Sequence, residues 1–105
     1  MSSLFAGQAT FDENISAWNT SRVTTMADMF RDATAFNQPL VWNTSQVTDM
    51  QGMFEYATAF NQPVAWDTRR VTDMRFMFMG ATAFNRPLVW NTSLVTTMAG
   101  MFEYA

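Results

Sequence analysis

The chain has 105 residues, enough for one domain, and 49% of them are hydrophobic, including ten Phe, ten Met and four Trp. Its formal net charge is -3 and its only basic residues are six Arg, so it lacks the basic face of a nucleic-acid-binding protein. Without Cys or His it has neither a disulfide framework nor the common zinc ligand sets, and we expect no catalytic, cofactor or metal site.

The first residues carry no targeting pattern. Met1–Ala6 shows no basic start followed by a long apolar stretch, so we expect no signal peptide. No apolar run elsewhere reaches the roughly 18 residues of a membrane span, so we expect no membrane insertion. An N-terminal cap, if there is one, is confined to Met1–Gln8.

One unit is copied through the whole chain. Several aromatic and Met positions recur every 24 residues, and the first unit holds one extra residue between Phe11 and Trp18. The recurring positions are Trp18, Trp42, Trp66 and Trp90; Phe30, Phe54, Phe78 and Phe102; Met29, Met53, Met77 and Met101; and Phe36, Phe60 and Phe84. A period of this length is typical of stacked repeats, so we predict that these side chains form structural ladders. The single domain 1–105 divides into units at about 5–29, 30–53, 54–77 and 78–101, with an uncapped start of a further unit at 102–105.

Each unit contains one predicted short helix. Apolar residues recur at i, i+3, i+4 and i+7, the spacing of one helix face. In one unit they are Met50, Met53, Phe54 and Ala57. Thr48 has the place of an N-cap and Gln51, three residues on, completes a capping-box pattern. We therefore predict a helix of two to three turns in every unit.

Each unit also contains one predicted short strand. Pro39–Asn43 is bulky, is entered through Pro and is bounded by turn formers, which predicts a strand of four to five residues. The predicted fold is an α/β solenoid, leucine-rich-repeat-like, with about four 24–25-residue units, each carrying one short parallel strand and one short helix. The repeated asparagines are expected to bond peptide groups of the next coil.

The pattern M-x-x-M-F-x-x-A-T-x-F-N-Q-x-L-x-x-W-N-T-S-x-V-T-x-M resembles the BspA-like surface-protein repeats, a leucine-rich-repeat-like family of bacterial surface proteins. The likeness covers Leu4 to Ala105; the later units are one residue shorter and carry Pro where the family often has Asp. The resemblance implies an extracellular or cell-surface location. It also implies a non-enzymatic recognition or adhesion module that binds protein or glycan, with no catalytic residue to transfer.

Four features have competing interpretations. The arginines around the third unit either contact an acidic partner or pair with Asp67 and Asp73; they are Arg69, Arg70, Arg75 and Arg86. The glycosylation sequons at Asn19, Asn43 and Asn91 are better explained as a turn repeated for geometry. The Thr ladders leave ice binding as a remote alternative, and the Met rows are better explained as core than as a Met-rich groove.

The chain end suggests an alternative function. Met101–Ala105 repeats the interior pattern without polar variation, so no C-terminal cap is visible. The candidate assembly end is Met101, Phe102 and Tyr104. The alternative to a recognition module is therefore a self-assembling structural subunit that forms head-to-tail filaments with further copies of itself through its uncapped ends.

Overall fold

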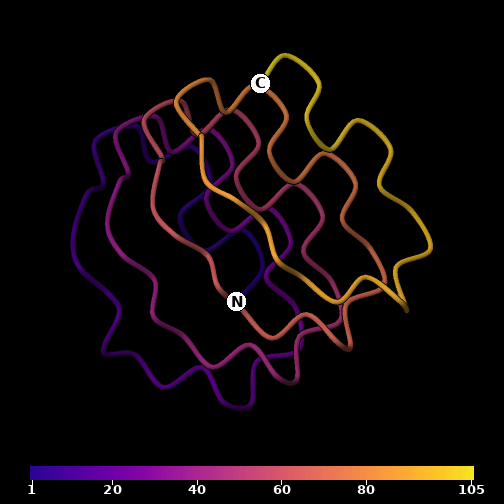
Figure 1. Ribbon diagram of the computed structural model, residues 1–105. Helices are drawn as coiled ribbons and strands as arrows, with labels where there is room; N and C mark the ends of the chain where they lie inside the picture. The colour runs from indigo at the N-terminus through magenta and orange to yellow at the C-terminus, as the bar shows by residue number, and fades with distance from the viewer.

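Successive coils of the chain follow the same path and lie one over another in the computed structural model, which describes residues 1–105 (Figure 1). Hydrogen bonds join residues one coil apart: Phe30 N–H donates to Met53 C=O at 2.9 Å, and Phe54 N–H donates to Met77 C=O at 2.8 Å. Isolated parallel bridges link the same position of four coils, at Thr25, Asp49, Asp73 and Thr97. Equivalent residues of successive units therefore lie over one another.

The predicted α/β solenoid, with a strand and a helix in each unit, is wrong. The chain contains no helix, and its only β-structure is the set of isolated bridges. All 42 backbone–backbone hydrogen bonds lie outside helices and strands, and Figure 1 accordingly shows neither coiled ribbons nor arrows. The molecule is a compact body with extents of 34 × 31 × 22 Å.

Two bends replace the predicted helix of each coil. Asp28 (φ 55°) and Asp32 (φ 58°) are left-handed, and a left-handed residue cannot continue a right-handed helix. The bends are closed by i to i-3 bonds, such as that from Ala33 N–H to Phe30 C=O at 3.0 Å. The same two positions have positive φ in every coil: Ser3, Asp28, Gly52, Phe76 and Gly100, and Gly7, Asp32, Tyr56, Gly80 and Tyr104. The two bends therefore bring the apolar side chains of a coil to one side, with the same sequence spacing as one face of a helix.

The predicted capping box is also absent. Thr48 donates both its N–H, at 2.8 Å, and its Oγ1, at 3.2 Å, to Thr24 C=O one coil away. Gln51 N–H donates to Asp49 Oδ1 at 2.9 Å, which closes a turn of its own. Both residues thus serve the contact between coils and the local bend.

Glycine lets large left-handed residues pack against the next coil. The ring of Phe76 lies over Gly100, where an added Cβ would come within 2.6 Å of that ring. The ring of Tyr56 lies over Gly80 in the same way. Because Gly has no Cβ, it accepts both the positive φ and the close approach.

The predicted strands are also missing. No backbone hydrogen bond joins one coil to the next in residues 37–43, 61–67 and 85–91. Each of these segments contains a proline, which has no N–H to donate to a ladder. Indole groups make the contact instead: Trp Nε1 donates to a carbonyl of the preceding coil at 2.7 to 3.1 Å. The pairs are Trp42 with Ile15, Trp66 with Leu40, and Trp90 with Val64.

The asparagines have two different roles. In the FNQP segments they bond the next coil as expected, because Asn61 N–H donates to Asn37 Oδ1 at 2.9 Å and the following pair repeats this. In the WNTS segments they bond their own turn, because Asn43 Oδ1 accepts from the N–H and Oγ of Ser45. The second role is the repeated turn expected at the glycosylation sequons.

Aromatic columns fill the centre. The rings of Phe30, Phe54 and Phe78 are 5.5 Å apart in succession, and those of Trp66 and Trp90 are 6.5 Å apart. A second Phe column stacks at 6.0 and 6.1 Å; its members are Phe36, Phe60 and Phe84. Three ladder Met residues are fully buried: Met29, Met53 and Met77. Ladder positions at the two ends are less covered, since Trp18 is 44% exposed and Phe102 is 52% exposed.

Candidate functional site

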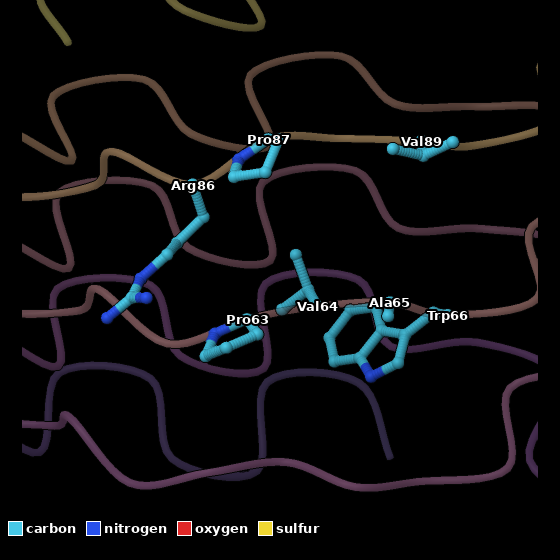
Figure 2. Close-up of a pocket in the computed structure, with 7 residues that line it drawn as sticks. All are labelled: Pro63, Val64, Ala65, Trp66, Arg86, Pro87 and Val89. Carbon is cyan, nitrogen blue, oxygen red and sulfur yellow. The ribbon is translucent and has the colours of Figure 1, made fainter.

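Apolar slots open between the coils along the three P-x-x-W segments, residues 39–42, 63–66 and 87–90. We call this surface the slot face. The larger slot has a volume of about 370 Å³ and lies between the second and third segments (Figure 2). Its lining residues are Pro63, Val64, Ala65, Trp66, Arg86, Pro87 and Val89. A smaller slot, of about 170 Å³, lies between the first and second segments and shares Pro63, Ala65 and Trp66 with the larger one.

The slots exist because the backbone hydrogen bonds between coils stop there. The central residue of each segment points outward: Val41 is 83% exposed and Val89 is 93% exposed, with Ala65 also exposed between them. The N–H and C=O groups of these three residues make no hydrogen bond within the chain. Val64 and Trp66 lie buried beneath them. The slot face thus combines an apolar floor with exposed aliphatic side chains and unbonded peptide groups.

Arg86 places a positive charge at one end of the larger slot. In Figure 2 its side chain reaches past Pro63, on the side of the slot away from Trp66. Its Nε donates to Asn61 C=O at 3.1 Å, and it takes part in none of the ion pairs of the chain. A carboxylate that approaches this end of the slot therefore meets a guanidinium without an acidic partner.

Two of the other three arginines form the ion pairs that were the alternative to contact with a partner. Arg69 pairs with Asp67, and Arg75 pairs with Asp73, each at 2.9 Å. Burial acts to raise the pKa of Asp73, but hydrogen bonds from the side chain and backbone of Arg75 outweigh it and hold that pKa below its usual value.

Arg70 is also engaged, because it donates to Gln46 Oε1 at 3.0 Å. Of the four arginines, only Arg86 lines a slot.

The charged form of Glu55 is disfavoured in the folded chain. Burial raises its pKa above 4.5, Arg31 at 3.7 Å opposes that shift, and Asp28 and Asp32 add to it. A raised pKa means that folding favours the protonated form, so the stability linked to this proton is present below pH 4.5 and is lost as the pH rises through the folded-state value.

Glu55→Gln is therefore expected to raise the melting temperature at pH 7 and to leave it unchanged at about pH 3.5, where both side chains are neutral. Thermal melts monitored by circular dichroism at the two pH values would measure this difference. Glu103→Gln, the exposed equivalent two coils further on, is the matched control. Equal shifts at both pH values for Glu55→Gln would contradict the assignment.

One of the threonine columns is buried and does not form an exposed face. Thr20, Thr44 and Thr68 are at most 2% exposed. Each donates its Oγ1 to a carbonyl of the next coil at 2.9 to 3.0 Å. These hydroxyls are therefore used inside the chain, and nothing in this column favours ice binding.

The candidate assembly end is only partly open. Met101 is 7% exposed, whereas Phe102 is 52% exposed and Tyr104 is 69% exposed. A hollow of about 210 Å³ adjoins them; it is lined by Met74, Leu88, Trp90, Thr92, Met98, Met101 and Phe102. This end of the chain is apolar and presents ladder positions that are buried in the inner coils.

No three His, Cys, Asp or Glu side chains gather in a way that would hold a metal ion. The chain has no helix with the length and apolar character needed to cross a membrane.

The sequence interpretation missed the slot face. It assigned the P-x-x-W segments to paired strands, which would have closed the space between coils. The available signal was the proline at the same position of three successive units, Pro39, Pro63 and Pro87, because three stacked prolines interrupt any ladder at that place.

Comparison with known proteins returns one family. A family model described as "Mycoplasma protein of unknown function, DUF285" matches residues 1–65 and again residues 64–105. No curated protein and no solved structure matches the chain.

Proposed function

The chain belongs to the DUF285 family, a repeat family related to BspA-like surface repeat proteins, and on that premise we propose that it is a non-enzymatic recognition module. It acts at the cell surface or outside the cell, in adhesion or recognition, and binds its partner through the slot face. The observation that carries the proposal is the row of apolar slots, one between each pair of neighbouring P-x-x-W segments.

A protein partner suits these slots better than a glycan. Their linings are mainly aliphatic, proline and aromatic, and apolar pockets of this kind take apolar side chains. Glycan sites often present an open aromatic face, but Trp66 is only 7% exposed. The exposed aliphatic residues Val41 and Val89 instead resemble the contact positions of a protein interface.

The test is selection of ligands by the intact chain. A random-peptide phage library and a glycan array would both be screened with the 105-residue protein, and the affinities of the ligands found would be measured by calorimetry. Val89→Asp is expected to weaken binding at least about tenfold, because it places a charge at the mouth of an apolar slot. Val89 is 93% exposed, so this variant should fold normally.

Thr82→Asp, at an exposed residue outside the slot face, is the matched control and should bind like the parent chain. Ligands that bind the Val89→Asp variant as well as the parent would place recognition elsewhere. Failure to select any ligand would count against the proposal itself.

A second candidate is head-to-tail association, which the backbone pattern favours at one segment. In the coil before the last, the N–H groups of Phe76, Phe78 and Gly80 donate to the next coil, so the equivalent groups of the last coil are free to bond a neighbour. Those donors are Gly100, Phe102 and Tyr104, and the matching acceptors on the first coil are the carbonyls of Ser2, Leu4 and Ala6.

Electron microscopy and light scattering of the 105-residue chain distinguish the candidates. Regular filaments support the structural subunit, whereas monomers or small oligomers support the recognition module.

A further inference from the structure

The spacing of the slots also indicates which class of ligand binds there. We infer that the slot face binds an extended, strand-like peptide that runs across the coils, places apolar side chains i and i+2 in the two adjoining slots, and sets a carboxylate beside Arg86. This inference rests on the proposed recognition function and names the ligand class of the same site.

The first support is the repeat distance of the slot face. The ring centroids of Trp66 and Trp90, which belong to neighbouring P-x-x-W segments, are 6.5 Å apart. Alternate side chains of a β-strand point to the same side and are about 6.7 Å apart, whereas a polyproline II segment brings only every third side chain to one side. Alternate side chains of an extended peptide therefore match successive slots without distortion of either partner.

The second support is the set of unbonded peptide groups, which distinguishes an extended ligand from a helix. Along a helix, residues i and i+4 are about 6 Å apart, so distance alone does not separate the two. A helix, however, uses its own backbone groups internally, whereas an extended peptide offers free N–H and C=O groups. The slot face offers the complement, because both backbone groups of Val41, Ala65 and Val89 are unbonded within the chain.

The third support is charge. Arg86 borders the larger slot, and its guanidinium has no carboxylate partner in the chain. The nearby arginines Arg69 and Arg75 are already neutralised by Asp67 and Asp73. The slot face therefore presents one uncompensated positive charge, and an acidic residue next to the apolar pair complements it.

The experiment uses three fluorescein-labelled synthetic peptides and fluorescence anisotropy. The first has leucines at i and i+2 in a Thr-rich background that favours a strand, with an adjacent Glu, and the second replaces that Glu by Gln. The third is an Ala-rich helical peptide with leucines at i and i+4 and the same Glu. The extended Glu peptide is expected to bind at least about tenfold more tightly than either of the others.

Two variants assign the contacts. Arg86→Gln is expected to abolish the preference for Glu over Gln, and Val89→Asp is expected to weaken both extended peptides at least about tenfold. Thr82→Asp should change neither affinity. Stronger binding of the helical peptide, a Glu preference that survives Arg86→Gln, or no measurable binding of the extended peptides would overturn the inference.

The outcomes also separate this inference from the broader proposal. If the peptides fail while phage-selected proteins or glycans bind in a manner that depends on Val89, the extended-peptide inference is wrong and recognition at the slot face stands. If the Val89→Asp variant binds every ligand like the parent, the slot face is not the site and both statements fail.

Discussion

Replacement of Trp66 by Ala is expected to lower the free energy of unfolding by about 3 to 5 kcal/mol, as for other large-to-small core substitutions. The indole is 7% exposed and stacks on Trp90 at 6.5 Å, so its loss leaves a cavity in an aromatic column. Its Nε1 also donates to Leu40 C=O at 2.9 Å, in a segment where no backbone bond joins the coils. Because small domains have only about 5 to 15 kcal/mol of net stability, this variant should lose a large share of the stability of the fold.

Urea denaturation followed by circular dichroism measures the change, and the chain supplies its own comparison. Trp18 has the same place in the first coil but is 44% exposed, so Trp18→Ala should cost clearly less. Trp66→Phe keeps one ring but removes the Nε1 donor and part of the indole volume, for a cost of about 1 to 3 kcal/mol. If Trp66→Ala melts like the parent, Trp66 does not hold the coils together and the account of the slot face is wrong.

Gly80→Ala is expected to lower the free energy of unfolding by about 2 to 5 kcal/mol. Gly80 has φ +67°, which costs a residue with a Cβ about 1 to 2 kcal/mol. The added methyl group would also overlap the ring of Tyr56 from the preceding coil, and overpacking of this kind adds about 1 to 3 kcal/mol.

Gly7→Ala separates these two effects. Gly7 has φ +73° at the same position of the first coil, but nothing lies within 4 Å of an added Cβ. Gly7→Ala should therefore lower the free energy of unfolding only by the cost of the positive φ, about 1 to 2 kcal/mol. In the double variant Gly80→Ala with Tyr56→Ala the steric part should disappear, and a double-mutant cycle would give the coupling. Equal losses for Gly7→Ala and Gly80→Ala would show that the contact with Tyr56 is not present.

The repeat and its columns were readable from the sequence, whereas the local backbone was not. Residues that recur at a fixed interval must occupy equivalent places if the units stack, and the Phe30, Phe54 and Phe78 rings are indeed in register. The spacing that predicted a helix was misleading, because two bends with left-handed residues four apart also bring the Met, Phe and Ala side chains to one side. Tertiary hydrogen bonds to the next coil then take the N–H groups that a helix would have used.

A signal for the bends was present. Gly and Asp, the residues that tolerate positive φ best, occupy the two bend positions again and again: Asp28, Gly52 and Gly100 at one, and Gly7, Asp32 and Gly80 at the other. Tyr56 and Phe76 interrupt both series, and their left-handed backbones depend on the neighbouring coil to hold them. A contact between coils cannot be recognised from one unit alone.

The candidate site was predicted only in part. The sequence singled out Arg86 but grouped it with three other arginines. The alternative of pairing with Asp67 and Asp73 holds for Arg69 and Arg75, but the sequence did not show which arginine would lie at a slot. Val41, Ala65 and Val89 were hidden by the expectation of paired strands. Only the absence of backbone pairing in these segments exposes their peptide groups and opens the slots.

The central claim is that backbone hydrogen bonds join each coil to its neighbours, most of them donated by an N–H group to a carbonyl of the coil that follows. Couplings across hydrogen bonds, measured by nuclear magnetic resonance between amide nitrogen and carbonyl carbon in the isotope-labelled chain, test this directly. The account predicts correlations from Phe30 N to the carbonyl of Met53 and from Phe54 N to the carbonyl of Met77. A correlation from Phe54 N to the carbonyl of Met50, as in an α-helix, would contradict it.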